Sequence, residues 1–179
     1  FVLVVAALGW LFDCLDQQLF ILARPAAMAE LVPGAAGATQ EQIDKDRKFY
    51  GDISTSIFIA GWACGGLVFG MLGDRIGRAK TMMITILMYS AFTGLSSFSQ
   101  GPWDFAFYRF LTGLGVGGEF AVGVALVAEV MPGAARPYTL GLLQALSAIG
   151  NISAAFINLG LGLAEEEGLP WSPWRIMFL

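Results

Sequence analysis

The sequence has 179 residues, of which 56% are hydrophobic and only 13% are charged, with a mean hydropathy of +0.68 and a formal net charge of −4. A water-soluble protein of this length needs more polar side chains to cover its surface, so the composition excludes a soluble globular domain and indicates lipid as the solvent. The chain contains no His, which excludes histidine-based catalysis and histidine proton relays within it.

Long apolar runs follow one another along the chain and predict an all-α bundle of transmembrane helices. A helix that crosses a bilayer needs about 20 predominantly apolar residues, whereas the strands of a membrane barrel are alternating segments of about 10 residues. Polar residues, Gly or Pro separate the runs. Because the chain begins without Met and stops inside an apolar run, we expect a fragment with five complete helices and the start of a sixth. The predicted spans are 1–31, 53–72, 81–98, 105–130, 140–163 and the truncated 174–179.

Basic residues predict which side of the membrane each connection occupies. If the helices alternate in direction, the polar stretch 32–51, a predicted loop with room for a short helix, lies on the same side as 99–104 and 164–173. The turns 73–80 and 131–137 then lie on the other side. Short cytoplasmic loops carry an excess of Lys and Arg, and the 73–80 turn is the densest in basic residues. We therefore expect this turn to be cytoplasmic and the chain to be a multi-pass protein of a bacterial-type inner membrane.

The turn between the second and third predicted spans combines glycines and charges in one ordered motif. Glycine permits a sharp turn and a close approach of backbones. The motif resembles the signature turn between helices two and three of the major facilitator superfamily, except that Ala79 stands where the signature often has a second basic residue. It reads Gly70-x-x-Gly73-Asp74-Arg75-x-Gly77-Arg78-x-Lys80.

Three further motifs lie where the same superfamily has them. An Arg followed by alternating glycines resembles its helix-four pattern, and the turn after that helix resembles its sugar-porter and organic-acid branches. An Asp-x-x-Asp in the first span is similar to helix one of the aromatic-acid and metabolite proton symporters, although Cys14 stands where that group often has Gly. The motifs run Arg109-Phe-Leu-Thr-Gly113-Leu-Gly115-Val-Gly117-Gly118-Glu119, Ala128-Glu129-x-x-Pro132-x-x-x-Arg136 and Asp13-Cys14-Leu15-Asp16.

The resemblance implies that the chain is the amino-terminal six-helix half of a twelve-helix secondary transporter that works by alternating access. Its partners would be a small organic solute, protons, the lipid bilayer and the missing carboxy-terminal half. Asp74 would cap a helix of that missing half, and Arg78 would join a charge cluster with Glu129 or Arg136. The implied conformational gate comprises Gly70, Asp74, Arg75, Gly77, Arg78, Glu129 and Arg136.

Four charged residues within the predicted spans are the candidates for proton coupling or substrate binding: Asp13, Asp16, Arg109 and Glu119. A charge at the centre of a bilayer costs about 2.5–3.5 kcal/mol on insertion scales, so such a residue usually faces a cavity or a partner. Asp13 and Asp16 share one helix face, and two carboxylates at this spacing disfavour simultaneous ionisation. The alternative for either Asp is a structural hydrogen bond.

The roles of Arg109 and Glu119 leave more than one reading open. Arg109 could pair with Asp16 across helices one and four, as the resemblance implies for proton coupling, and could then bind an anionic substrate once Asp16 is protonated. It could instead extend its charged end to the outer interface. Glu119 could serve protons or substrate, or be a buried hydrogen-bond donor in its neutral form.

Amide and glycine residues within the spans have two possible uses. Gln17 and Gln18 on the first span, and Gln144, Asn151 and Asn158 on one face of the fifth, are candidates for lining a cavity, with helix–helix hydrogen bonding as the alternative. The glycines of the 105–130 span, and Gly61-x-x-x-Gly65 in the second span, predict close packing of span four against helix one or two.

The favoured function is proton-coupled transport of a small organic solute, a carboxylate or other polar metabolite. An uncoupled facilitator, a drug/proton antiporter and a non-transporting truncated remnant are the alternatives. An enzyme is not expected, because the sequence has no metal-ligand cluster and no nucleophile–base set. No cofactor, metal or nucleic acid is expected either.

Overall fold

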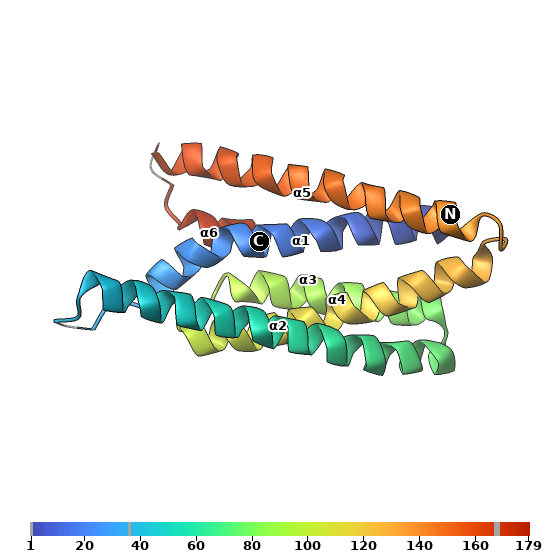
Figure 1. Cartoon of the computed structure of the whole chain (residues 1–179), viewed down its shortest axis with the longest axis horizontal. Coiled ribbons are helices and arrows are strands. Elements are labelled where there is room, and N and C mark those ends of the chain that lie inside the picture. Colours follow the sequence, from blue (N-terminus) through green and yellow to red (C-terminus); the bar gives the residue numbers. More distant parts are fainter. Residues whose placement is uncertain (1, 36, 167–168) are drawn as a thin grey trace.

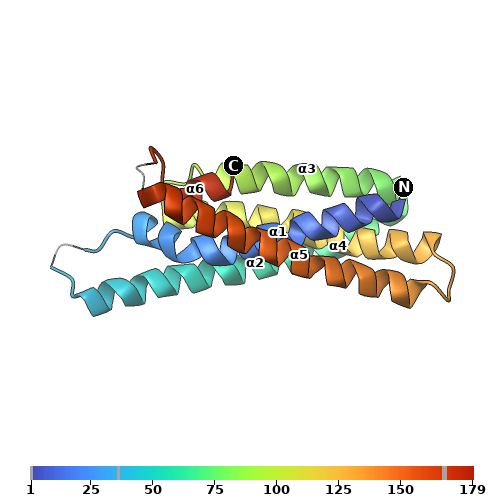
Figure 2. The ribbon, with the colours of Figure 1, turned by 90° about the horizontal axis from the view of Figure 1, so that it is seen from above.

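A computed structural model describes residues 2–35, 37–166 and 169–179 and shows a bundle of α-helices, with no strand among these residues (Figure 1). Consecutive helices run in alternating directions along one long axis (Figures 1 and 2). The all-α transmembrane fold predicted from the sequence is confirmed. The helices are α1 (Val2–Leu31), α2 (Gln40–Ile76), α3 (Arg78–Ser96), α4 (Pro102–Val130), α5 (Arg136–Glu166) and the short α6 (Pro173–Met177).

Four of these helices are long and apolar enough to cross a membrane: α1 over Ala6–Leu31, α2, α4 and α5 over Arg136–Glu165. The predicted span at 81–98 corresponds to α3, which has 19 residues and is therefore about 28 Å long at 1.5 Å per residue, close to the thickness of the hydrocarbon core. It falls outside the four because Lys80 and several Thr and Ser residues lower its mean hydropathy.

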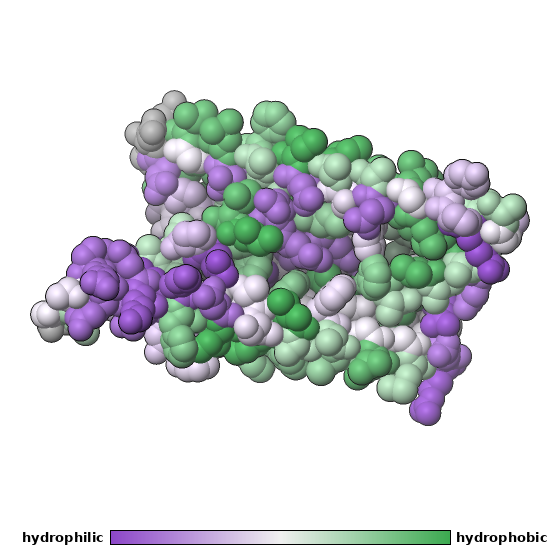
Figure 3. Space-filling view, viewed as in Figure 1, coloured by the Kyte–Doolittle hydropathy of each residue, from purple (hydrophilic) through white to green (hydrophobic). Residues whose placement is uncertain are grey.

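The polar stretch 32–51 contains more than the short helix for which the sequence left room, because α2 already begins at Gln40 and continues into the second span. Thr39 caps this helix: its hydroxyl accepts a bond from the Gln42 backbone N–H, while the Gln42 side chain accepts one from the Thr39 N–H, 3.0 Å away. This reciprocal capping box satisfies two free N–H groups at the start of the helix. Helix thus replaces most of the predicted loop, and a polar extension of α2 projects from that end of the bundle (Figure 3).

Glycines allow α2 and α4 to pack with their backbones in contact. Gly113 and Gly117 of α4 lie against the backbone carbonyls of Phe58 and Trp62, and Gly61 of α2 lies against that of Phe110 in return. The predicted packing of span four against helix two is confirmed. Gly115 and Gly118 also lie against Thr85, with Tyr89 or Phe69 beside them, so α3 is a second partner that the sequence did not indicate.

The remaining helices form a second group in which α1 packs mainly on α5, with α4 as its link to the first group. Figure 1 shows α5 and α2 on opposite sides of α1, with α2 crossing in front of α4, so a face bounded by α2 and α5 is turned toward the viewer. The charged residues of α1 and α4 that the sequence singled out lie between these two groups.

Candidate functional site

Arg109 is completely buried near the end of the bundle where α3 ends and α6 lies. Its Nη1 atom lies 3.8 Å from Oδ2 of Asp16, an ion pair that joins α4 to α1. Its Nη2 atom donates to Oγ of Ser96, 3.0 Å away, and to Oγ1 of Thr112, 3.2 Å away. Because Asp16 is itself only 7% exposed, neither charge of this pair is screened by water.

Three aromatic rings surround the same guanidinium. The carbon Cζ of Arg109 lies 4.7 Å from the ring centre of Phe178, 5.3 Å from that of Phe20 and 5.9 Å from that of Phe105. Cation–π attraction is strongest for such a desolvated cation. The arginine therefore does not extend to the outer interface, and Asp16 is the carboxylate with which it forms an ion pair among the described residues.

Asp13 and Glu119 are also buried, each 2% exposed, but they lie away from the arginine. Oδ1 of Asp13 and both carboxyl oxygens of Glu119 have no hydrogen-bond partner within the described residues. Glu119 instead lies against Gly9 of α1, where a Cβ atom would overlap its Oε1. These two acids thus form a second acidic site between α1 and α4.

A cavity of about 360 Å³ opens on the face bounded by α2 and α5. In Figure 3 hydrophilic residues gather in the middle of this face. Four of the amides proposed from the sequence as cavity-lining residues border it, together with Asp13, whereas the fifth, Asn158, borders a different cavity. Arg109, Asp16 and Glu119 are not among the residues that border it, which are Trp10, Asp13, Cys14, Gln17, Gln18, Ile21, Trp62, Val116, Phe120, Gln144, Ser147 and Asn151.

At the other end of the bundle, Arg78 contacts three other residues of the predicted gate. Its Nε donates to Oε1 of Glu129 on α4, 3.1 Å away, its Nη1 donates to the carbonyl of Gly70, 3.3 Å away, and its Nη2 pairs with Asp74. Gly77, with φ +97°, makes the sharp turn between α2 and α3 in a conformation that favours glycine.

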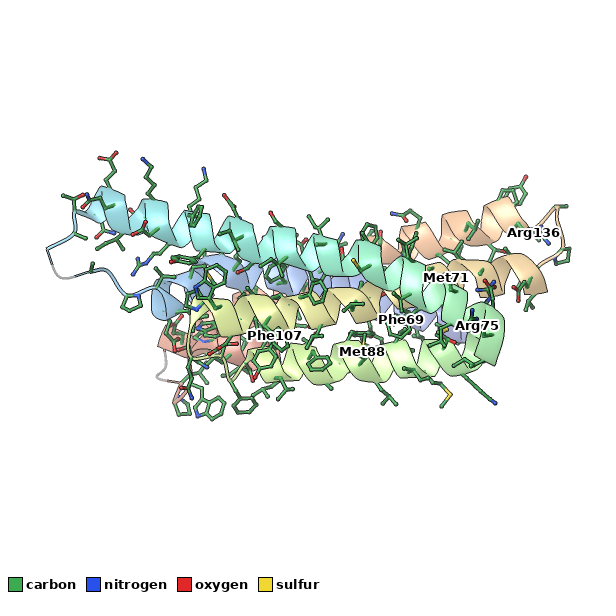
Figure 4. The ribbon with its side chains drawn as sticks, turned by 90° about the horizontal axis from the view of Figure 1, so that it is seen from below. Phe69, Met71, Arg75, Met88, Phe107 and Arg136 are labelled. Atoms are coloured by element: carbon green, nitrogen blue, oxygen red, sulfur yellow. The ribbon has the colours of Figure 1, made fainter. Side chains whose placement is uncertain are left out.

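The other two gate candidates do not join this cluster. Arg136 donates to the carbonyl of Met131, 3.1 Å away, and so closes its own turn, while Arg75 is exposed. Figure 4 places both arginines at the same end of the bundle, where Arg75 lies in the last turn of α2 and Arg136 begins α5. Of the two partners proposed for Arg78, the structure therefore brings Glu129 to it and not Arg136.

A polar cluster at the opposite end was missed in the sequence analysis. Glu30, at the end of α1, accepts bonds from Trp174 Nε1, 2.7 Å away, and from Ser172, and pairs with Arg175 at 2.8 Å. Arg175 also donates to the carbonyls of Ser97 and Ser99. No spacing rule indicates this cluster, because Glu30 and Arg175 are 145 positions apart.

The Ser96 and Thr112 contacts of Arg109 were missed as well, although Thr112 follows Arg109 by three positions on one helix face.

The described helices have the fold of a major facilitator bundle. The structure of the proton:xylose symporter XylE bound to 6-bromo-6-deoxy-D-glucose superimposes with a TM-score of 0.78 at 18% identity, covering 99% of this chain and 40% of that one. The model of the sugar (and other) transporter family matches residues 20–179. The chain belongs to this family, and it is a multi-pass integral protein of the plasma membrane. The superfamily resemblance of the four motifs is thereby confirmed.

Bacterial relatives agree with this assignment. A putative metabolite transport protein of Haemophilus influenzae is 32% identical over 179 residues, which cover 99% of this chain and 39% of the relative. The putative niacin/nicotinamide transporter NiaP of Bacillus subtilis is 35% identical over 156 residues, which cover 86% of this chain and 35% of the relative. The chain thus spans less than two fifths of the length of these two relatives.

Proposed function

We propose that this chain is the amino-terminal bundle of a transporter that couples the movement of a small organic carboxylate or polar metabolite to protons by alternating access. The observation that carries the proposal is the buried Asp16–Arg109 pair. A carboxylate and a guanidinium taken out of water are tolerated only while they face each other, because either charge alone would be left uncompensated. Protonation of Asp16 removes half of the pair, so it changes the balance between two arrangements of α1 and α4.

The geometry supports a coupling role for Arg109 rather than direct contact with the solute in this conformation. Its guanidinium is enclosed by rings and hydroxyls and does not border the cavity. Gln17, Gln144 and Asn151 do border it and offer both donors and acceptors, as a polar solute requires. The solute would bind between these amides and the carboxy-terminal half, as in other transporters built from two bundles.

Changing Asp16 to Asn is expected to abolish accumulation of solute against its gradient while allowing downhill equilibration. The reason is that Asn keeps the shape of Asp but cannot take up and release a proton. The measurement is uptake into proteoliposomes of the full-length protein under an imposed pH gradient, with labelled nicotinate, benzoate and D-xylose. Protein-free vesicles correct for passive entry of the two acids.

Asp104→Asn is the matched control, because Asp104 is an exposed carboxylate in the first turn of α4 and the change is chemically the same. It should leave accumulation unchanged. Equal gradient-driven accumulation in Asp16→Asn and in the native protein would rule out Asp16 as the coupling group. Equal downhill equilibration in both, with no accumulation in either, would instead indicate an uncoupled facilitator.

We further propose that the Asp74–Arg78–Glu129 cluster holds one of the two alternating states. Arg78 ties the end of α2 to the end of α4 through groups that are partly exposed, and such ion pairs contribute only about 0.2–1 kcal/mol. That amount is too small to decide folding, but it shifts a conformational equilibrium by up to about five-fold. An Asp74→Asn variant should therefore fold normally and change its accessibility.

Cys14 provides the measurement, since this residue borders the cavity. In a full-length protein with Cys14 as its single cysteine, an impermeant maleimide is applied from each side of the membrane. The ratio of the two labelling rates should change by up to about five-fold in Asp74→Asn and remain unchanged in Asp104→Asn. An unchanged ratio together with an unchanged transport rate in Asp74→Asn would disprove the gating role.

A further inference from the structure

Asp13 and Glu119 are a second pair of acids that the Asp16–Arg109 pair does not neutralise. Asp13 precedes Asp16 by three residues on α1. Glu119 follows Arg109 by ten residues on α4, a distance of about 15 Å along the helix axis at 1.5 Å per residue. The guanidinium of Arg109, which pairs with Asp16, therefore cannot also reach Glu119.

The two acids share one enclosed site. Both border a small cavity of about 10 Å³, which is close to the least volume that holds one water molecule. The carboxyl group of Glu119 fits there because Gly9, one helical turn before Asp13, has no side chain: an added Cβ would overlap Oε1 and would lie 3.2 Å from Cδ of Glu119. Glycine at position 9 is thus what gives α1 room for a carboxyl group from α4.

No cation faces this site among the described residues. The titratable groups near it are Asp16 and Cys14 on α1 and Tyr89 on α3, while the guanidinium of Arg109 on α4 faces Asp16. The residues that α2 and α5 contribute to the two adjoining cavities, such as Trp62 and Gln144, are uncharged. Two carboxylates ionised together in such a place would repel each other without a counter-ion and with room in the small cavity for about one water molecule, which disfavours the doubly ionised form.

We propose that Asp13 and Glu119 together hold one proton, as a carboxylic acid facing a carboxylate across the small cavity, and so form a second proton-binding site of the transporter. Asp13 also borders the large cavity, so it is the group through which this proton enters and leaves. In the transfer, one O–H bond breaks and another forms, and no other bond changes. The consequence for transport, two protons moved per solute, rests on the proposed function.

Infrared difference spectroscopy tests the proton without requiring transport. The full-length protein in lipid vesicles should show the carbonyl stretching band of a protonated carboxylic acid at pH 7. Asp13→Asn and Glu119→Gln should each shift the frequency of the band, because one variant leaves Glu119 beside an amide and the other leaves Asp13 beside an amide. The double variant has neither acid and should lose the band. Asp16→Asn and Asp104→Asn should retain it. Absence of the band from the native protein, or its survival in the double variant, would overturn the proposal.

The coupling ratio tests the consequence. With the membrane potential clamped at zero, the logarithm of the accumulation ratio of labelled nicotinate rises with the pH difference, and the slope is the number of protons per solute. The slope should fall from about two to about one in Glu119→Gln. A slope of one in the native protein would overturn the second site as a coupling site. No accumulation by the native protein would count against the proposed function, while the infrared result would still decide whether the acids hold a proton.

Discussion

An Arg109→Met variant of the full-length transporter will lose gradient-driven uptake and unfold at a lower temperature than the native protein. Met approximates the length of the arginine and packs well among the rings of Phe20, Phe105 and Phe178. It cannot neutralise Asp16, however, and removing one partner of a buried ion pair typically costs about 3–5 kcal/mol because it leaves the other charge uncompensated. The measurement is the unfolding temperature in detergent, combined with uptake in proteoliposomes.

The double variant Asp16→Asn/Arg109→Met separates the ion pair from the packing. If the cost of Arg109→Met comes from the unpaired carboxylate, then replacing Asp16 by Asn will restore part of the lost stability, while uptake stays uncoupled. Losses of stability that simply add in the double variant would show that the two groups do not interact. Arg109→Lys keeps the charge but cannot donate to Ser96 and Thr112 with the planar fork of arginine, so it should fall between Met and the native residue.

Helix positions could be predicted from the sequence because the bilayer demands long apolar runs, and composition alone reports these. The start of α2 was misplaced because residues 40–52 are polar and polarity suggested a loop. The local signal was present, since Thr39 and Gln42 have the spacing of a capping box and the residues that follow favour helix. The capping box and the helix propensities, used together with hydropathy, therefore predict that α2 begins near residue 40.

The sequence predicted which residues belong to the candidate site, but not which of them lie next to one another. Charges in apolar runs identified Asp13, Asp16, Arg109 and Glu119, because lipid makes such charges costly. That Arg109 lies with Asp16, and Glu119 against Gly9, depends on the rotation and depth of α1 relative to α4. How α1 and α4 are placed against each other depends on how their surfaces pack, and the residue pattern of one helix alone does not predict it.

Changing Gly117 to Ala will separate α2 from α4 and reduce the amount of folded protein. The new methyl group would lie 2.7 Å from the carbonyl carbon of Trp62 and still closer to its oxygen, and a backbone carbonyl in a helix cannot rotate away as a side chain can. Overpacking of a well-filled interior costs about 1–3 kcal/mol, and a backbone clash belongs at the upper end of that range. The yield of monodisperse full-length protein and its unfolding temperature in detergent measure the effect.

Gly123→Ala is the matched control, because Gly123 lies on the same helix six residues later and an added Cβ there meets no atom within 4 Å. It should leave the yield unchanged and raise the unfolding temperature slightly, since Ala favours helix over Gly by about 1 kcal/mol. Both variants raise the helix propensity of α4 in the same way, so the difference between them measures the effect of the contact between α2 and α4. Equal behaviour of the two variants would mean that the helices can move apart without cost, and that the glycines of α4 do not hold the bundle that positions Arg109 and Glu119.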